Sequence, residues 1–563
     1  MCRIRPSEPN RTVSGKALRR SPRSNASPWS TSIGKRIPKS SPKDWALPRL
    51  SRVFTPITWN RPAARSCSRW NAGSSLRQGR HQDAHTLTTA GPLTSRIATG
   101  VPPVKQERVS SGSRSPALPA GVAAAEAGAV AVLTDPAGAE RAAATGLPVL
   151  VVDDPREALG AVAATVYGDP TAGLTMIGVT GTAGKTSTSY LIESGLRAAG
   201  RSTGLIGTVE TRLGDLVIDS VRTTPEATDL HAMLAVARER GVDTVVMEVS
   251  SHALAMGRVG GVRFDVGGYT NFGSDHLDFH ADEADYFAAK AKLFDGRCAV
   301  EVLNHDDPAL RPLRKPATVT YSAAGDPAAT WWADGVDGEG YAQRFTLHGP
   351  DGLTLPTGVA LPGRHNVANA LLAIAVLVAT GVDPATAAAG VAACGGVPGR
   401  LELVSGDAPV RGVVDYAHKA NAIEAVLTAL RGLTAGRLVC VVGAGGDRDR
   451  AKRPVMGAAA AAGADVVLVT DDNPRTEDPA VIRAEVLAGA YDANPGARII
   501  EVPGRRAAIE EAVRLAEPGD VVAVLGKGQE RGQEVNGEVL PFDDRVELAE
   551  ALRARFGDRV GQR

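Results

Sequence analysis

The segment 175–200 constrains the fold of this chain more than any other. It reads TMIGVTGTAGKTSTSYLIESGLRAAG, which predicts a buried strand, a glycine-rich turn and a helix in direct succession. Glycines let backbone N–H groups approach phosphate oxygens, and the helix N-terminus adds a favourable positive potential. Val179 makes the turn a TGTxGKT variant of the strict GxxxxGK[S/T] loop. A tight turn without a ligand would not need Lys185 followed by Thr186, so we expect this loop to bind a nucleotide. Lys185 would then contact the phosphates, and the Thr186 hydroxyl would bind magnesium.

The rest of the chain from about Pro119 repeats one rhythm. Short apolar runs end in polar or glycine-rich residues and alternate with Ala-rich helical stretches, as in VDTVVMEVSSHAL and ADVVLVTDDNPR. With 43% hydrophobic residues, 4% aromatics and 62 glycines, this rhythm predicts an α/β protein with more than one doubly wound sheet. Ligands of such sheets bind at the carboxyl ends of the strands.

Residues 1–117 differ sharply in composition from the remainder of the chain. They hold 22 of the 63 Lys and Arg residues but only 4 of the 62 Asp and Glu residues, and they show no sustained helical or strand period. Three interpretations stay open: a solvated tail, a nucleic-acid or membrane-surface arm, or a stretch that is not authentic coding sequence. The sequence shows no secretory leader and no run of about 20 apolar residues. The five cysteines form no CxxC pair, which suits a reducing cytoplasm and argues against zinc.

Three side chains are candidates for metal chemistry, although each alone has a simpler interpretation. Glu248 ends an apolar run and His276 lies in SDHLDFH, and either could be an ordinary hydrogen-bonded residue near a strand end. Lys290 lies in a predicted helix, where a lysine is usually a solvated charge. Together the three residues support a metal site more strongly than each does alone, because phosphoryl transfer requires metal ions and cations to neutralise the phosphate charge.

Eleven motifs in order make the chain similar to a known family. They are TGTAGKTST, TTPE, MEVSSHAL, TNFGSDHLDFH, AAKAKLF, GRHNVANALLA, VPGRLE, DYAHK, GGDRDRAKRP, DDNPR and GKGQE. Across roughly residues 120–550 the chain resembles the Mur ligases, and among them the members that add meso-diaminopimelate to UDP-N-acetylmuramoyl-L-alanyl-D-glutamate in peptidoglycan synthesis. The resemblance implies an ATP-dependent, ADP-forming acid–amino acid ligase that works through an acyl phosphate.

The resemblance also implies a domain division. Residues 118–172 would be a remnant of the N-terminal domain for the UDP-linked substrate, 173–398 a central P-loop-type ATPase domain, and 399–563 a Rossmann-like domain for the amino acid. The DSR-type strand and the uridine loop of the family are not found in residues 1–117, which puts uridine binding in doubt. The implied protein is a cytoplasmic monomer that acts on small molecules, without nucleic acid or membrane.

The family's functional residues carry over position by position. Lys185, His276 and Lys290 match catalytic positions, and Lys290 matches the lysine that is carbamylated in the family. Magnesium would be held by Thr186, Glu248, His276 and carbamylated Lys290. The positions that match ATP contacts are Gly181, Thr182, Gly184, Lys185, Thr186, Ser187, Asn366, Arg400, Asp415 and His418. Those that match the muramyl dipeptide site are Thr223, Thr224, Ser250 and Arg258.

The choice of amino acid has its own signal in DNPR. Family members that use diaminopimelate carry the Arg at position 475, and an arginine can bind the distal carboxylate that lysine lacks. The matching positions are Arg448, Asp472, Asn473, Pro474, Arg475, Gly526 and Glu530. Departures from the family pattern are Gln529 in place of His, Ser274 before Asp275, and KAN after His418.

Two alternatives remain at this point. A folylpolyglutamate synthase-like ligase shares the phosphate loop and the modified lysine, but DNPR and GKGQE argue against it. An inactive nucleotide-binding pseudoenzyme, lacking the uridine-binding half-domain, is opposed by the intact set of Lys185, Glu248, His276 and Lys290.

Overall fold

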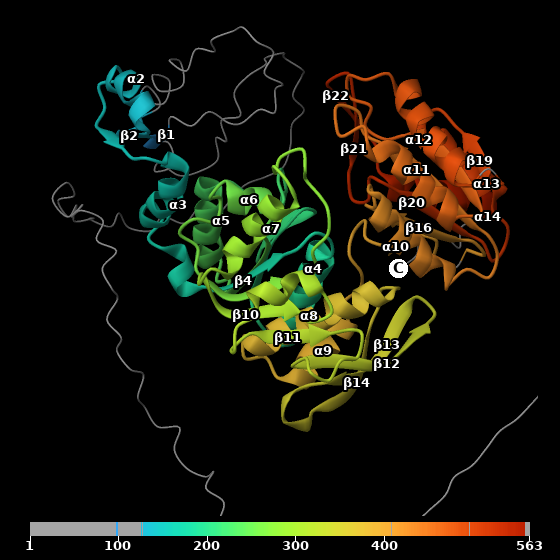
Figure 1. Cartoon of the computed structure of the whole chain (residues 1–563), viewed down its shortest axis with the longest axis horizontal. Helices are drawn as coiled ribbons and strands as arrows, with labels where there is room; N and C mark the ends of the chain where they lie inside the picture. Colours follow the sequence, from blue (N-terminus) through green and yellow to red (C-terminus); the bar gives the residue numbers. More distant parts are fainter. Residues whose placement is uncertain (1–96, 100–124, 126–127, 407, 495, 558–563) are drawn as a thin grey trace, which may run out of the picture. The chain divides into compact units, whose positions relative to one another are not determined.

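The computed structural model describes residues 97–99, 125, 128–406, 408–494 and 496–557 of the 563-residue chain. They form four sheets with helices between the strands (Figure 1). The predicted α/β class is therefore confirmed. Most of the basic segment 1–117 lies outside the described residues.

The first sheet is small and parallel. Its order is β1 (Ile97–Thr99), β2 (Ala131–Thr134) and β3 (Val149–Val151), with α2 (Ala139–Ala143) and α3 (Pro155–Val166) in the same part of the chain. β1 lies in the segment for which the sequence predicts no regular structure. Three residues are too short to show a period, and it is the ladder to β2 that defines this strand.

The second sheet has 11 strands in the order β14-β13-β12-β11-β10-β9-β4-β8-β5-β6-β7. Its middle, from β5 to β12, is parallel, and antiparallel pairs close both edges. The strand bounds are β4 Thr175–Thr180, β5 Thr203–Ile206, β6 Glu210–Leu213, β7 Leu216–Asp219, β8 Thr244–Glu248, β9 Phe264–Tyr269, β10 Cys298–Asn304, β11 Val319–Ser322, β12 Trp331–Glu339, β13 Ala342–His348 and β14 Thr354–Val359.

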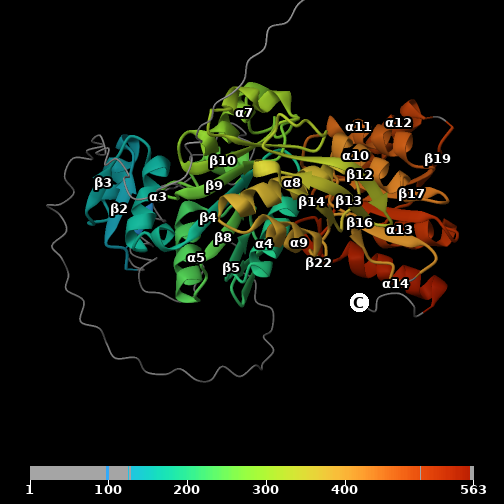
Figure 2. The ribbon, with the colours of Figure 1, turned by 90° about the horizontal axis from the view of Figure 1, so that it is seen from below.

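Helices cover both faces of this sheet (Figure 2). One core packs α4 (Lys185–Ala198), α8 (Arg364–Ala379) and α9 (Pro384–Ala392) against the strands, because α8 is apolar on nearly every side. The other core contains α5 (Ala227–Glu239) and α6 (Ser251–Ala255). The helix α7 (Glu283–Ala291) begins at Asp282, whose carboxylate caps it.

The third sheet has the order β15-β16-β20-β17-β18-β19, parallel except for β15. The strands are β15 Glu402–Leu403, β16 Arg411–Asp415, β17 Leu438–Ala444, β18 Val466–Asp471, β19 Arg498–Glu501 and β20 Val521–Leu525. The helices are α10 Ala420–Arg431, α11 Lys452–Gly463, α12 Pro479–Ala493, α13 Arg505–Leu515 and α14 Asp544–Phe556. The hairpin of β21 (Gly532–Val535) and β22 (Glu538–Pro541) is the fourth sheet. Parallel pairing brings the carboxyl ends of β16, β17, β18 and β20 to one edge, as the sequence predicts.

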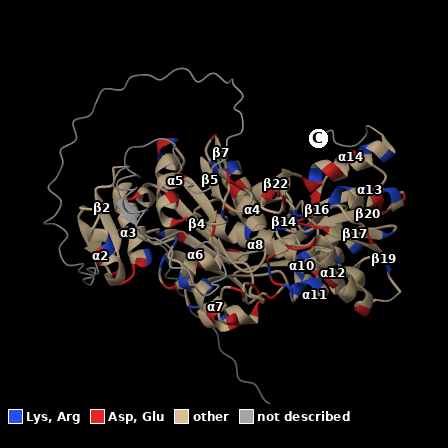
Figure 3. Cartoon of the chain, turned by 90° about the horizontal axis from the view of Figure 1, so that it is seen from above, with Lys and Arg blue, Asp and Glu red and all other residues tan. Residues whose placement is uncertain are grey.

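The described surface carries both signs of charge, as α14 illustrates in Figure 3. No helix among the described residues is long and apolar enough to cross a bilayer.

Candidate active site

The phosphate loop joins β4 to α4, as the sequence predicts. Gly181 (φ 141°) and Gly184 (φ 83°) adopt backbone conformations that favour glycine. A Cβ atom at Gly181 would lie 1.8 Å from Thr270 Oγ1, and one at Gly184 would lie 2.5 Å from Asn369 Oδ1. Asn271 fixes the loop by accepting hydrogen bonds from the backbone N–H groups of Thr182 (2.8 Å) and Ala183 (3.1 Å). The loop is thus shaped by residues that follow β9.

Two lysines converge on the loop. Lys185 Nζ and Lys290 Nζ each donate to the carbonyl oxygen of Gly181 at 2.8 Å, and Lys290 lies over the ring of Tyr286. Burial lowers the pKa of Lys185, and it lowers the pKa of Lys290 well below the usual range, with the Lys185 cation as the next cause. Two lysine nitrogens thus share one buried acceptor, the Gly181 carbonyl oxygen.

Thr186 and Glu248 form the metal-binding candidate that the sequence predicts. Thr186 Oγ1 donates to Glu248 Oε2 at 3.0 Å, at the carboxyl end of β8. Thr208 donates to the same carboxylate from its backbone N–H (2.8 Å) and its hydroxyl (3.0 Å). A hydroxyl and a buried carboxylate are hard oxygen ligands, and Mg²⁺ completes such a partial set with phosphate and water oxygens. The residues therefore fit magnesium.

His276 lies on a different loop from that carboxylate and pairs with other groups. Its φ of 55° is left-handed, and its Nε2 lies 3.3 Å from Asp275 Oδ2. Asp275 also forms an ion pair with Lys419, which follows DYAH. Burial lowers the pKa of His276 to about 3, so the ring is neutral and able to coordinate a metal. Within the described residues, no three His, Cys, Asp or Glu side chains form a ready-made metal cluster.

The four residues predicted for the muramyl dipeptide lie together beside Glu248. Thr224 Oγ1 donates to the Glu248 carbonyl at 2.8 Å and accepts from Ser250 N at 3.1 Å. Thr223 Oγ1 lies 3.0 Å from Thr208 Oγ1, and Arg258 donates to the Thr224 carbonyl at 3.4 Å. The chain thus brings these four positions to the side of the phosphate loop.

The residues outside the phosphate loop that are predicted to contact ATP differ in their partners: Arg400 contacts side chains, whereas Asp415 binds backbone groups. Arg400 lies over the Tyr416 ring and donates to Gln529 Oε1 (2.8 Å) and Thr186 Oγ1 (3.5 Å). Asp415 instead accepts backbone N–H groups of Leu401 and Ala417, both at 2.7 Å. Burial raises the pKa of Asp415 and lowers that of His418 to about 4.

Asn366 is buried at the start of α8. Its amide nitrogen donates to the Pro362 carbonyl at 2.8 Å, and its amide oxygen accepts from Asn369 at 3.0 Å. Asn369, which is bonded to Asn366, lies against Gly184, so these two residues connect α8 to the phosphate loop.

The predicted amino-acid residues meet at the carboxyl edge of the third sheet. Lys527 Nζ donates to Asn473 Oδ1 and Glu530 Oε2, both at 2.9 Å, and Asn473 donates to Glu530 at 3.0 Å. Lys527 also lies 3.6 Å from Asp472. Gly526 packs beside Asp472, where a Cβ would lie 2.9 Å from its carboxylate.

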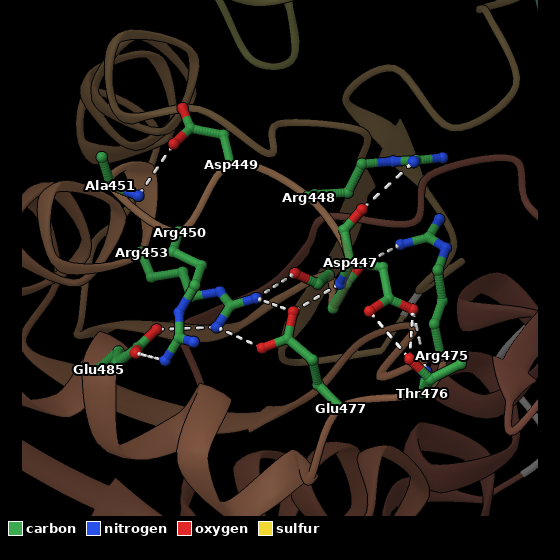
Figure 4. Close-up of polar contacts among 12 residues, drawn as sticks. Asp447, Arg448, Asp449, Arg450, Ala451, Arg453, Arg475, Thr476, Glu477 and Glu485 are labelled. Atoms are coloured by element: carbon green, nitrogen blue, oxygen red, sulfur yellow. Dashed lines mark hydrogen bonds and ion pairs between the residues drawn. The ribbon is translucent and has the colours of Figure 1, made fainter. Parts of the chain in front are cut away.

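Arg475 and Arg448 come from two loops that are bonded to each other (Figure 4). Arg475 Nη1 donates to the Gly446 carbonyl at 2.8 Å, and Gly446 N donates to the Asn473 carbonyl. Arg448 is exposed and donates only weakly to Asp447, at 3.4 Å. Pro474 gives the loop its turn, with its carbonyl against Gly446.

Several residues at these sites were not predicted from sequence. Thr208 and Tyr286 lie in none of the motifs, whereas Asn271 lies inside TNFGSDHLDFH, where His276 alone was singled out. Lys527 and Gln529 lie inside GKGQE, so a test of every position in that motif for burial would have found them. Glu534 follows no motif, and only the hairpin pairing brings it to Arg475.

A phosphate loop on one sheet, with oxygen ligands for magnesium, and a charged edge on a second sheet together define an ATP-dependent ligase. Sequence profiles agree: the Mur ligase middle domain matches residues 179–377, and the Mur ligase glutamate ligase domain matches residues 399–528. The chain belongs to the Mur ligase family of ATP-dependent, ADP-forming acid–amino acid ligases, and the predicted family is confirmed.

Individual proteins within and beyond this family are also similar to the chain. The UDP-N-acetylmuramoyl-L-alanyl-D-glutamate–2,6-diaminopimelate ligase of Streptomyces coelicolor is 55% identical over 440 residues, which cover 77% of this chain and 87% of the relative. A solved structure with the same name is 31% identical, covers 82% of this chain and 92% of its own, and has a TM-score of 0.57. Folylpolyglutamate synthase of Mycobacterium tuberculosis is 22% identical, covers 72% of this chain and 95% of its own, and has a TM-score of 0.55, which shows a shared fold alone.

Proposed function

We propose that this chain joins meso-diaminopimelate to UDP-N-acetylmuramoyl-L-alanyl-D-glutamate, with conversion of ATP to ADP and phosphate, in peptidoglycan synthesis. The observation that carries the proposal is Arg475, whose guanidinium is held by the Gly446 carbonyl and Glu534 in the loop that also supplies Asn473 to the Lys527 and Glu530 cluster. An arginine beside mixed charges suits the distal end of diaminopimelate, which bears an amine and a carboxylate. The names of the similar ligases support the same substrate.

The reaction proceeds in two steps. The glutamyl carboxylate oxygen attacks the γ-phosphorus of ATP, so that an acyl phosphate forms and ADP leaves. The amine of diaminopimelate then attacks the acyl carbon, and the tetrahedral adduct expels phosphate while the amine loses a proton. Lys185 holds the γ-phosphate charge in the first step, and Arg400 approaches the same phosphates from beside Thr186. Thr186 and Glu248 would hold magnesium, with His276 as a further candidate ligand, and the ion would neutralise charge on the phosphates.

We further propose that Lys290 is carbamylated. Its lowered pKa favours the neutral amine, which can attack CO₂, form an N–C bond and release one proton. The product places an anion beside Lys185, at the Gly181 carbonyl that both lysine nitrogens now share. This anion attracts the Lys185 cation, and it supplies an additional carboxylate for the metal site.

We expect Lys290→Ala to lose ligase activity by about 100-fold or more, since the anion that balances Lys185 and the metal is gone. Millimolar formate or acetate should restore part of this loss, because a small carboxylate fits the space that is vacated. The control is Lys292→Ala, an exposed neighbour. A carbamate signal in ¹³C NMR with labelled bicarbonate should disappear in Lys290→Ala only, and its persistence would contradict the assignment.

The domain bounds 118–172, 173–398 and 399–563, the monomeric state and the cytoplasmic location remain parts of the same proposal. Each is implied by the family resemblance. Sedimentation of the purified chain with and without substrates checks the monomer.

Mass spectrometry of the reaction product tests the function itself. Purified protein is incubated with ATP, magnesium and UDP-N-acetylmuramoyl-L-alanyl-D-glutamate, with either meso-diaminopimelate or L-lysine. A UDP-tripeptide with diaminopimelate alone is the expected product. In a parallel incubation with a folate and glutamate, addition of glutamate to the folate would favour the folylpolyglutamate synthase alternative. ATP binding without any product would favour a pseudoenzyme.

A further inference from the structure

The backbone at Arg475 is held in an uncommon conformation. Its φ of 53° is left-handed, which a long side chain adopts at a cost. Such a conformation persists only where the surroundings impose it, and it concentrates at functional sites. Asp447, on the facing loop, has a φ of 51° and accepts both the backbone N–H and the hydroxyl of Thr476 (Figure 4).

The β21–β22 hairpin holds this backbone from the other side. Arg475 N donates to the Glu534 carbonyl at 3.0 Å, and Asn536 N donates to the Arg475 carbonyl at 2.7 Å. Arg475 and Val535 form an isolated parallel bridge. Glu534 N donates to Asn473 Oδ1 at 2.9 Å. Both peptide groups of Arg475 are therefore bonded to one hairpin.

The same hairpin also fixes the guanidinium. Arg475 Nε donates to Glu534 Oε2 at 2.8 Å, while Nη1 donates to the Gly446 carbonyl at 2.8 Å. Nη2 makes no hydrogen bond within the described part of the chain. Bonds on Nε and Nη1 stop the planar group from rotating and leave Nη2, with the second hydrogen of Nη1, for a ligand.

We propose that Glu534 is the positioning residue that sets amino-acid specificity, by holding the Arg475 guanidinium ready for the distal carboxylate of the incoming amino acid. This inference rests on the proposed function. An arginine that is already oriented loses less side-chain entropy on binding, so the preference for a carboxylate-bearing amino acid increases. A loosely held arginine would distinguish diaminopimelate from lysine less well.

The ion pair between Glu534 and Arg475 contributes little to the stability of the fold. The Glu534 side chain is 40% exposed and that of Arg475 is 20% exposed, and pairs so placed contribute little to folding. The hairpin keeps its backbone bonds to Arg475 whatever side chain stands at position 534. Substitution of Glu534 should therefore change amino-acid binding without changing the fold.

The experiment compares Glu534→Ala and Glu534→Gln with the control Glu538→Ala. Glu538 is exposed on the same hairpin, and its carboxylate makes no hydrogen bond within the described residues. Loss of one charge-assisted hydrogen bond should raise KM for diaminopimelate about tenfold in Glu534→Ala. The ratio of kcat/KM for diaminopimelate over lysine should fall by a similar factor, while KM for ATP and the melting temperature stay unchanged. Glu534→Gln, which keeps an acceptor, should rescue part of the loss.

Two outcomes would overturn the inference. An unchanged KM and selectivity in Glu534→Ala would show that the arginine needs no partner. A joint rise in KM for all substrates, with a lower melting temperature, would show a structural role only. The wild-type product assay separates these outcomes from failure of the proposed function: a wild-type enzyme that prefers an amino acid without a distal carboxylate refutes both.

Discussion

At the residue scale, Glu248 connects the phosphate loop with the predicted dipeptide site. It accepts from Thr186 of the phosphate loop and from Thr208, and its carbonyl accepts from Thr224 of the predicted dipeptide site. Glu248 is 1% exposed, and the hydrogen-bond partners of its buried carboxylate are hydroxyl and amide groups. Such a group is stabilised further by a cation, which is the physical reason to expect magnesium here.

We expect Glu248→Gln to raise the magnesium concentration for half-maximal activity roughly 10- to 100-fold, because an amide oxygen carries no net charge for the metal. Magnesium titration of ligase activity measures this shift. The control is Glu239→Gln, at an exposed position at the end of α5. An unchanged magnesium dependence in Glu248→Gln would remove Glu248 from the metal site.

At the scale of elements, the phosphate loop depends on parts of the chain that are distant in sequence. Asn271 after β9 holds two of its N–H groups, Thr270 limits the space at Gly181, and Asn369 of α8 limits it at Gly184. The loop motif therefore specifies a conformation that only the surrounding sheet and α8 make rigid.

Gly181→Ala should destabilise the protein by about 1–3 kcal/mol, because a non-glycine residue at φ 141° is strained and its Cβ would collide with Thr270 Oγ1. We also expect a higher KM for ATP, since the loop must shift. Urea denaturation and ATP titration measure the two effects. Gly241→Ala is a matched control: its φ of 72° is also positive, but nothing lies within 4 Å of the added Cβ, so KM for ATP should stay constant.

At the scale of the whole molecule, ion pairs at the amino ends of the third sheet's strands couple stability to pH. Asp520 accepts the backbone N–H of Arg437 at 2.6 Å, that of Glu517 at 2.9 Å, and the Arg437 guanidinium at 2.8 Å. Burial raises the pKa of Asp520. The hydrogen bonds and the Arg437 guanidinium together lower it by more than burial raises it, so the pKa lies below its usual range.

A folded-state pKa below the unfolded value of about 3.9 stabilises the fold above that pH. This stabilisation is lost as the pH falls through the folded-state pKa. We expect the urea midpoint of the wild type to exceed that of Asp520→Asn by a nearly constant amount between about pH 7 and 5, and this difference to shrink below about pH 4. Asp492→Asn, at an exposed position, should leave the midpoint at the wild-type value throughout. A difference between wild type and Asp520→Asn that stays unchanged down to about pH 3 would contradict this assignment.

The sequence by itself determined the fold class, the family and the position of each strand end that carries chemistry. It could do so because these features are local: an apolar run followed by glycines or charged residues predicts a strand end in any context. Lys185, Thr186 and Glu248 were found in this way, whereas Arg475 came from the family resemblance.

Only the tertiary structure decided which of these side chains meet. Lys185 and Lys290 are 105 positions apart in the sequence, yet they share the Gly181 carbonyl, and Arg475 is oriented by Glu534. Neither pairing leaves a local signal, because each depends on strand order and on a hairpin register that many distant contacts determine together. The chemistry could be predicted from segments, whereas its positioning depends on the packed sheets.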